Sequence, residues 1–266
     1  MDILLLKLFL APLLVVASAL AGRRWGPNVA GVLVGLPIVA GPILFITYRQ
    51  HGAEFVAAAA GSALFGLVAL ATFAVVYSRV AHRAGWLSTM ATTWIAVMVV
   101  DVALSFVHVT VLAAFAITLI ANAAAMRSMP KIDAGNAGGA APPRWDLPGR
   151  ALATAILVLT VTTASTALGP RWTGLLAPFP IATSVLAGFV HAQHGPVVTT
   201  RALAGVLMGL FGFATFCLTV AVLARPLGAA ALALGAAVTV AVQLLVGLTR
   251  GTLRGKWRDG RKTLGA

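Results

Sequence analysis

Charged residues are scarce in this sequence of 266 residues. They make up 9% of the chain, whereas hydrophobic residues make up 60%. A soluble domain carries about 25% charged residues, because its surface faces water. The shortage therefore excludes an ordinary soluble domain and predicts that most of the surface faces lipid.

Acidic residues are the rarest charges. The chain has six Asp and Glu against 19 Lys and Arg, which gives a formal net charge of +13. The basic residues lie between apolar runs and in residues 250–266, not along one amphipathic face. This placement predicts a role in membrane topology and in attraction to anionic lipid headgroups. We expect no binding to nucleic acid, which requires a basic surface that follows the phosphates.

Cysteine and catalytic motifs are nearly absent as well. The single cysteine, Cys217, lies in an apolar run, which excludes a disulfide framework and argues against a thiolate metal site. The sequence has no phosphate-binding glycine loop with its lysine, no His-Glu-x-x-His and no Gly-x-Ser-x-Gly. We therefore expect neither an enzyme nor a cofactor or metal site.

Long apolar runs recur along the chain. A helix needs roughly 20 apolar residues to cross about 30 Å of hydrocarbon. The runs predict an all-α, polytopic membrane protein of about nine transmembrane helices, at residues 3–21, 29–48, 55–79, 86–103, 107–126, 149–168, 172–192, 198–224 and 229–249. Residues 86–126 are too long for one crossing, so we divide them into a hairpin.

The composition changes to Gly, Ala and Pro between the predicted fifth and sixth helices, which is typical of a solvated linker. The predicted domains are a first membrane repeat with one extra helix at 1–126, a cytoplasmic linker at 127–148, a second membrane repeat at 149–249 and a basic cytoplasmic tail at 250–266.

Basic residues also indicate the orientation. With the N-terminus outside, fifteen Lys and Arg fall in cytoplasmic loops and the tail, and three fall outside, namely Arg49, Arg171 and Arg225. Basic residues resist translocation. The sequence therefore predicts a protein of the bacterial cytoplasmic (inner) membrane with its N-terminus outside and its C-terminus inside.

Two parts of the sequence repeat each other. Residues 26–85 align without a gap with residues 169–228. The matches include Gly26-Pro27 with Gly169-Pro170, Pro37-Ile38 with Pro180-Ile181, and Gln50-His51-Gly52 with Gln193-His194-Gly195. Five predicted helices separate equivalent positions, and this odd number inverts the second copy. We expect an inverted-topology repeat, an architecture of many secondary transporters.

Prolines interrupt two predicted helices at matching positions. Pro37 and Pro180 lie about eight residues into their helices, hence about 12 Å deep and near the bilayer midplane. Paired broken helices at matching places point to a substrate site, although a pair of packing kinks is the alternative. The predicted substrate-binding residues are Pro37, Gly41, Pro178, Pro180, Thr183 and Ser184.

Four ionisable residues are candidates for gating or proton coupling. His51 and His194 occupy equivalent turns, where they either cap helix ends or form gates at opposite mouths. Asp101 and Glu54 would be proton-coupling candidates if buried, because carboxylates within a membrane are costly. The predicted topology instead places both at the outer boundary, where water can solvate them.

The segment Trp172-Thr173-Gly174-Leu175-Leu176-Ala177-Pro178-Phe179-Pro180-Ile181-Ala182-Thr183, followed by His191 and Gly195, resembles the GlpM-like family of small bacterial inner-membrane proteins. The likeness covers 149–249 and, more loosely, 3–106. It implies a fused, inverted pair of such units plus one extra helix, and an association with alginate production. In size and symmetry the arrangement is also similar to the drug/metabolite transporter superfamily.

These observations predict a transporter for a small molecule or a lipid-linked precursor, working by alternating access around the broken helices. The alternatives are a scaffold or accessory subunit for envelope polysaccharide production and a passive channel. A polar cavity at Pro37 and Pro180 that opens to one side would favour transport, a dry packed centre the scaffold, and a continuous wet pore the channel. Expected partners are the bilayer, anionic lipid headgroups at the tail and an unknown small molecule, and a homodimer is a possible assembly.

Overall fold

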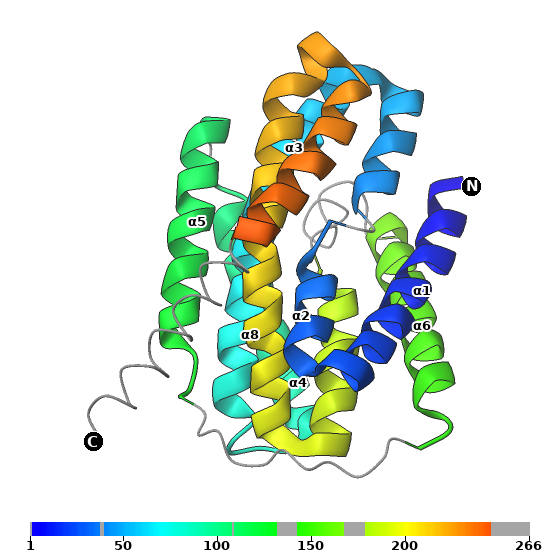
Figure 1. Cartoon of the computed structure of the whole chain (residues 1–266), viewed down its shortest axis with the longest axis vertical. Helices are drawn as coiled ribbons and strands as arrows, with labels where there is room; N and C mark the ends of the chain where they lie inside the picture. Colours follow the sequence, from blue (N-terminus) through cyan, green and yellow to red (C-terminus); the bar gives the residue numbers. More distant parts are fainter. Residues whose placement is uncertain (1, 38–39, 108, 132–142, 168–178, 246–266) are drawn as a thin grey trace, which may run out of the picture.

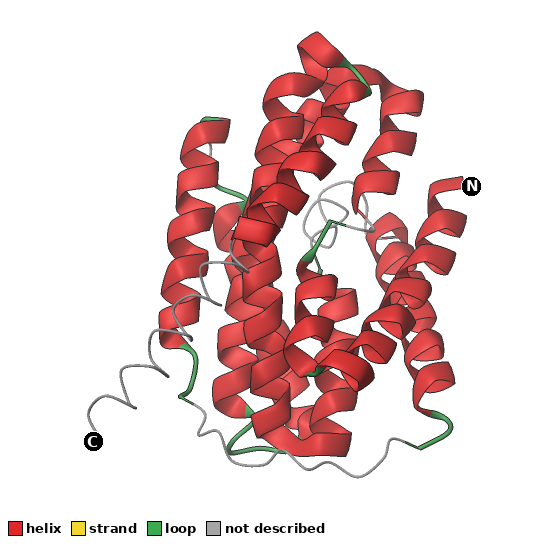
Figure 2. Cartoon of the chain, in the orientation of Figure 1, coloured by secondary structure: helices red, strands yellow, loops and turns green. Residues whose placement is uncertain are grey.

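The computed structural model describes residues 2–37, 40–107, 109–131, 143–167 and 179–245. This part of the chain consists of helices joined by turns, without strands (Figures 1 and 2). The predicted all-α class is confirmed. Most of the predicted linker and the whole tail lie outside the described residues.

Five described helices are long and apolar enough to cross a membrane, as a multi-pass membrane protein requires. They are Leu8–Trp25, Tyr48–Val80, Trp86–Leu104, Val111–Ser128 and Ile181–Leu227. A shorter apolar helix, Ala230–Leu245, follows the last of them. Within the described ranges, each of the nine predicted helices has a helical counterpart, except for the start of the seventh.

The elements follow one another as α1 (Asp2–Trp25), α2 (Pro27–Gly35), α3 (Ala40–Val80), α4 (Trp86–Leu104), α5 (Val111–Ser128), α6 (Asp146–Ala167) and α8 (Ile181–Leu227). Gly26 separates α1 from α2 with a φ of 97°, a left-handed conformation that suits glycine. Pro27 then begins α2, where its fixed φ fits and its missing N–H costs nothing. The predicted second helix is thus two pieces, α2 and the first part of α3.

The two longest elements each contain a sharp turn at a glycine. Gly52 divides α3 into residues 40–51 and 53–80, and Gly195 divides α8 into residues 181–194 and 196–227. Their backbone angles nearly coincide, at φ 82°, ψ −178° for Gly52 and φ 77°, ψ −179° for Gly195. Figure 1 shows α3 turning back at the upper end of the bundle and α8 at the lower end.

Glycines allow α2 to lie directly against α8. Gly31 and Gly35 face the backbone of α8, while Gly205 and Gly209 face the backbone of α2. A Cβ atom added at Gly209 would lie 2.7 Å from the carbonyl oxygen of Val32, closer than real Cβ contacts. Small residues four apart permit this close approach of two helices.

The helices α4 and α5 pack against α3 and α8, and each does so through one narrow row of buried residues. The buried face of α4 includes Thr89, Thr93, Val97 and Asp101, which follow one another at intervals of four residues. On α5, Asn122 is buried and its Nδ2 atom donates to the carbonyl oxygen of Leu207 at 2.9 Å. Both helices therefore expose most of their apolar surface, as helices that face lipid do.

Candidate functional site

The break between α2 and α3 lies at Pro37. The preceding residue, Leu36, is extended at φ −84° and ψ 155°, because the proline ring disfavours the helical conformation there. The helix resumes beyond the proline, where the amide of Gly41 donates to the carbonyl oxygen of Pro37 at 2.9 Å. The residues before and after Pro37 thus belong to two separate helical segments.

A cavity of about 870 Å³ borders this break. It lies among α2, residues 40–51, α8 and the helix Ala230–Leu245, and its lining includes Pro37, Gly41, Phe45 and Phe216. Its volume falls within the range of about 300–1,000 Å³ that is typical of ligand pockets. Two of the six predicted substrate-binding residues therefore line a cavity large enough for a ligand.

The polar side chains of this cavity are already engaged. The Thr239 hydroxyl donates to the carbonyl oxygen of Gly235 at 2.8 Å. The Gln243 Nε2 atom donates to the carbonyl oxygens of Met208 and Gly209 at 3.0 and 3.1 Å. The remaining lining is mostly apolar. Since burying an unpaired polar group is costly, the cavity suits a hydrocarbon group better than a polar one.

The second predicted break has different surroundings. Pro180 immediately precedes α8, and its carbonyl oxygen accepts from the amide of Ser184 at 2.8 Å. Thr183 and Ser184 are buried, and the Ser184 hydroxyl accepts a hydrogen bond from Trp94 Nε1 of α4 at 3.0 Å. The described residues that line the cavity do not include any of these three. Pro178 lies outside the described residues.

The two Gln-His-Gly turns differ in their exposure. Gln50 and His51 are exposed, and the ring of His51 lies 4.8 Å from that of Phe55. Gln193 and His194 are half-buried, at the turn that lies at the lower end of the bundle. Equivalent sequences at the two ends therefore have unequal environments.

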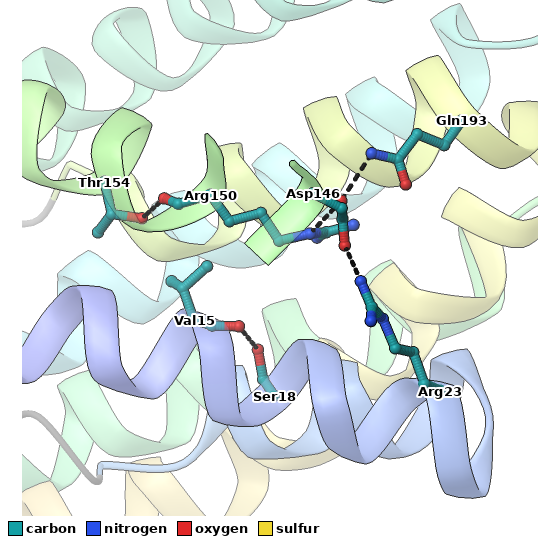
Figure 3. A network of polar contacts seen from close by, with 7 residues as sticks. All are labelled: Val15, Ser18, Arg23, Asp146, Arg150, Thr154 and Gln193. Carbon is teal, nitrogen blue, oxygen red and sulfur yellow. Dashed lines mark hydrogen bonds and ion pairs between the residues drawn. The ribbon is translucent and has the colours of Figure 1, made fainter. Parts of the chain in front are cut away.

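Asp146, a buried residue at the start of α6, forms a polar network with three side chains, of which Arg150 is buried, Gln193 is half-buried and Arg23 is 37% exposed (Figure 3). Its Oδ2 atom accepts from Arg23 Nη2 of α1 at 2.8 Å. Its Oδ1 atom accepts from Arg150 Nε at 2.9 Å and from Gln193 Nε2 of α8 at 2.6 Å. We call these four residues the Asp146 network. It joins α1, α6 and α8.

Hydrogen bonds and charge keep Asp146 ionised. Burial opposes its charged form, but the hydrogen bonds from Arg23 and Gln193 and the charge of Arg150 more than offset this effect. The pKa of Asp146 consequently lies below its usual value. The guanidinium group of Arg150 also lies 5.0 Å from the centre of the Phe189 ring, within the range of a cation–π interaction.

The Asp146 network is not fully satisfied. Within the part of the chain that the structure describes, three buried atoms at or beside it have no hydrogen-bond partner, namely Arg150 Nη1, Gln193 Oε1 and His194 Nδ1. Two arginines and one carboxylate give it a formal charge of +1. A partly buried network that leaves polar atoms without hydrogen-bond partners contributes little to stability, and its side chains can exchange hydrogen bonds when neighbouring helices move.

The two carboxylates predicted as proton-coupling candidates, Glu54 and Asp101, differ in burial and in their partners. Glu54 is exposed and forms an ion pair with Arg225 at 2.9 Å. Asp101 is 6% exposed, and its Oδ2 atom has no partner among the described residues. The expectation that water solvates Asp101 is therefore wrong, because its position in the buried row of α4 turns it toward the bundle. It meets the burial condition for a proton-coupling residue.

Sequence reasoning did not identify the Asp146 network or a second buried polar pair. The Tyr77 hydroxyl lies 3.3 Å from His191 Nδ1, and both side chains are buried between α3 and α8. The sequence signals near these groups are the repeated Gln-His-Gly and His191 itself, which belongs to the segment that resembles the GlpM-like family. The sequence places Asp146 in the predicted linker and Arg23 among the basic residues that indicate topology.

No protein-family model, curated protein or solved structure matches this chain. The likeness to GlpM-like proteins and to the drug/metabolite transporter superfamily therefore stays a prediction.

Proposed function

We propose that this protein is a transporter of the bacterial inner membrane that moves an amphipathic small molecule or lipid-linked precursor by alternating access. The observation that carries the proposal is the break at Leu36–Pro37, which borders a cavity of about 870 Å³. Interrupted helices around a central site are the usual construction of secondary transporters.

The lining of the cavity supports the substrate class. A polar cavity at Pro37 and Pro180 would favour transport of a polar solute, whereas this cavity borders Pro37 alone of the two. The polar groups of Thr239 and Gln243 bind backbone carbonyls and leave a largely apolar interior. An apolar part of the substrate would occupy this space, and a polar part would extend beyond it. This arrangement favours a lipid-like substrate over a small hydrophilic solute.

An inverted repeat is the second part of the proposal. The coincident backbone angles of Gly52 and Gly195 support equivalent roles for the two turns. The turns of α3 and α8 point to opposite ends of the bundle, as inversion requires (Figure 1). Two inverted halves could then exchange conformations and open the cavity first to one side and then to the other.

The Asp146 network is the proposed gate on the side predicted to be cytoplasmic. It joins α1, α6 and α8 through contacts to the buried carboxylate of Asp146, whereas Glu54 and Arg225 at the opposite end form only an exposed pair. Exposed ion pairs contribute about 0–1 kcal/mol, so they resist opening weakly. In this proposal the structure represents the state closed toward the cytoplasm, and His194 belongs to the gate.

A scaffold or accessory subunit is the second candidate. The close packing of Gly31 and Gly35 of α2 against Gly205 and Gly209 of α8 favours it. Two helices whose backbones are in direct contact cannot easily move past each other. A rigid contact between α2 and α8 therefore suits a structural role better than a movement of the two halves against each other. A continuous pore has no comparable support in the described part of the chain.

Profiling the lipids and metabolites of a deletion strain tests the proposal. The strain is complemented with the parent chain, with Ala236→Trp, which fills the cavity, or with Leu234→Trp, an exposed position on the same helix outside its lining. We expect deletion to change the level of an amphipathic compound, and we expect Leu234→Trp but not Ala236→Trp to restore it at equal membrane levels. Full restoration by Ala236→Trp would favour the scaffold.

A further inference from the structure

A second cavity lies at the lower end of the bundle, where α3 and α5 end. Its volume is about 610 Å³, and its lining consists of Arg79, Val80, His82, Arg83, Ser128 and Pro130. It is separate from the cavity at Pro37, with which it shares no described lining residue. We call it the basic pocket.

Two side chains of the basic pocket are held in place by neighbouring helices. Arg79 donates through Nε and Nη2 to the carbonyl oxygen of Ser128, at 3.3 and 3.1 Å. His82 Nε2 lies 3.5 Å from the hydroxyl of Thr200 on α8. A guanidinium group has five N–H donors, and these two contacts leave Arg79 able to bind an anion with its remaining N–H groups.

No carboxylate of the described residues neutralises the positive charge of the pocket. No carboxylate lines it, and no ion pair in the described ranges involves Arg79 or Arg83. Glu54 pairs with Arg225, and Asp146 pairs with Arg23 and Arg150. The fixed Arg79 and the exposed Arg83 therefore present a site of positive potential to a ligand.

The pocket also lies where a membrane surface would be. It sits between the end of the apolar helix Tyr48–Val80 and the start of Trp86–Leu104. Trp86 and Leu87 follow Arg83 closely and are 43% and 65% exposed. Exposed tryptophan beside arginine is typical of the interface between lipid headgroups and hydrocarbon.

We propose that the basic pocket binds the phosphate-bearing headgroup of an anionic phospholipid. Arg79 and Arg83 would hold the phosphate by charge-assisted hydrogen bonds, and the acyl chains would pass over the exposed Trp86 and Leu87. Basic pockets between helices at the cytoplasmic side are known to hold such headgroups. The site is independent of the proposed transport function, because none of its residues takes part in the Pro37 cavity or the Asp146 network.

Native mass spectrometry of the purified full chain in non-ionic detergent tests the site. Phosphatidylglycerol and phosphatidylcholine are added separately, and inorganic phosphate is then added as a competitor. We expect the parent chain to retain phosphatidylglycerol in preference to phosphatidylcholine. We expect Arg83→Gln to weaken this binding about tenfold and Arg79→Gln with Arg83→Gln to weaken it further.

The matched control is Arg127→Gln, since Arg127 is an exposed arginine at the end of α5 that does not line the pocket. It should bind phosphatidylglycerol as the parent chain does. Arg83→Gln removes no contact seen in the described residues, so its folding should be intact even if the double variant unfolds. Equal retention of the two lipids, unchanged binding by Arg83→Gln, or displacement of the lipid by millimolar phosphate would each overturn the proposal.

Discussion

Arg23 and Asp146 lie 123 residues apart in the sequence, yet Arg23 Nη2 donates to Asp146 Oδ2 at 2.8 Å. This contact joins the first helix of the chain to α6, the helix that follows the predicted linker. The two helices belong to different predicted repeats. The ion pair is therefore one of several direct polar links between the two predicted halves, together with the hydrogen bonds from Trp94 to Ser184 and from Asn122 to Leu207.

Removing Arg23 should loosen the lower end of the bundle. In a Cys217→Ala background, a Thr154→Cys reporter lies one turn beyond Arg150 on α6, at a position that is fully buried in the parent chain. We expect Arg23→Gln to speed maleimide labelling of this reporter about tenfold. This factor corresponds to a decrease of about 1.4 kcal/mol in the free energy needed to open the lower end of the bundle. The neighbouring Arg24→Gln is the control, and equal labelling rates in the two variants would contradict the role of Arg23.

The ionised state of Asp146 should make stability depend on pH. Because its pKa is lower in the folded protein than in the unfolded chain, the ionised group stabilises the fold above the unfolded pKa of about 3.9. This contribution is lost as the pH falls through the lower, folded pKa. We expect Asp146→Asn to lower the free energy of unfolding by about 3 kcal/mol at pH 7, because it leaves buried arginine charge unpaired.

The difference between the parent chain and Asp146→Asn should shrink below about pH 4, where the Asp146 carboxylate begins to protonate in the unfolded parent chain but stays ionised in the folded one. Thermal unfolding in non-ionic detergent between pH 7 and pH 3 measures the difference in unfolding temperature between the two proteins. Glu54→Gln removes an exposed carboxylate and should change the unfolding temperature little at any pH. A difference for Asp146→Asn that is constant across this range would show that its charge does not stabilise the fold.

The contact between α2 and α8 should tolerate no added methyl group. A Cβ atom at Gly209 would lie 2.7 Å from the carbonyl oxygen of Val32 and 2.8 Å from the Cα of Gly35. We expect Gly209→Ala to destabilise the protein by about 1–3 kcal/mol, the usual cost of overpacking. Gly61→Ala is the matched control, since its Cβ would meet only the side chain of Val111, at 3.4 Å. Equal unfolding temperatures for the two variants would argue against a tight crossing.

Local features of the fold could be predicted from the sequence. The helix break at Pro37 follows from the proline ring, which fixes its own φ and restricts Leu36. The turns at Gly52 and Gly195 follow from glycine, which alone adopts a φ near 80° without strain. The spacing of Gly205 and Gly209, four residues apart, is typical of a close contact between two helices.

Long-range relationships could not be predicted in the same way. The pairing of Arg23 with Asp146 depends on how α1 packs against α6, and a single sequence does not encode that contact in any local pattern. The burial of Asp101 depends on which face of α4 meets the bundle, and an almost uniformly apolar helix gives no signal of that face. The apolar cavity likewise depends on long-range packing, because the helix Ala230–Leu245 and the break at Pro37 line it from distant parts of the sequence.

Alternating access is the central claim, and distances between spin labels at the two ends of the bundle test it most directly. In a Cys217→Ala background, one variant carries Arg24→Cys with Ala192→Cys near the Asp146 network, and the other carries Phe55→Cys with Leu227→Cys at the opposite end. All four positions are exposed. We expect two distance populations at each end in lipid nanodiscs, with Arg23→Gln lengthening the lower distance while it shortens the upper one. A single distance at both ends that Arg23→Gln leaves unchanged would contradict a transporter of this kind.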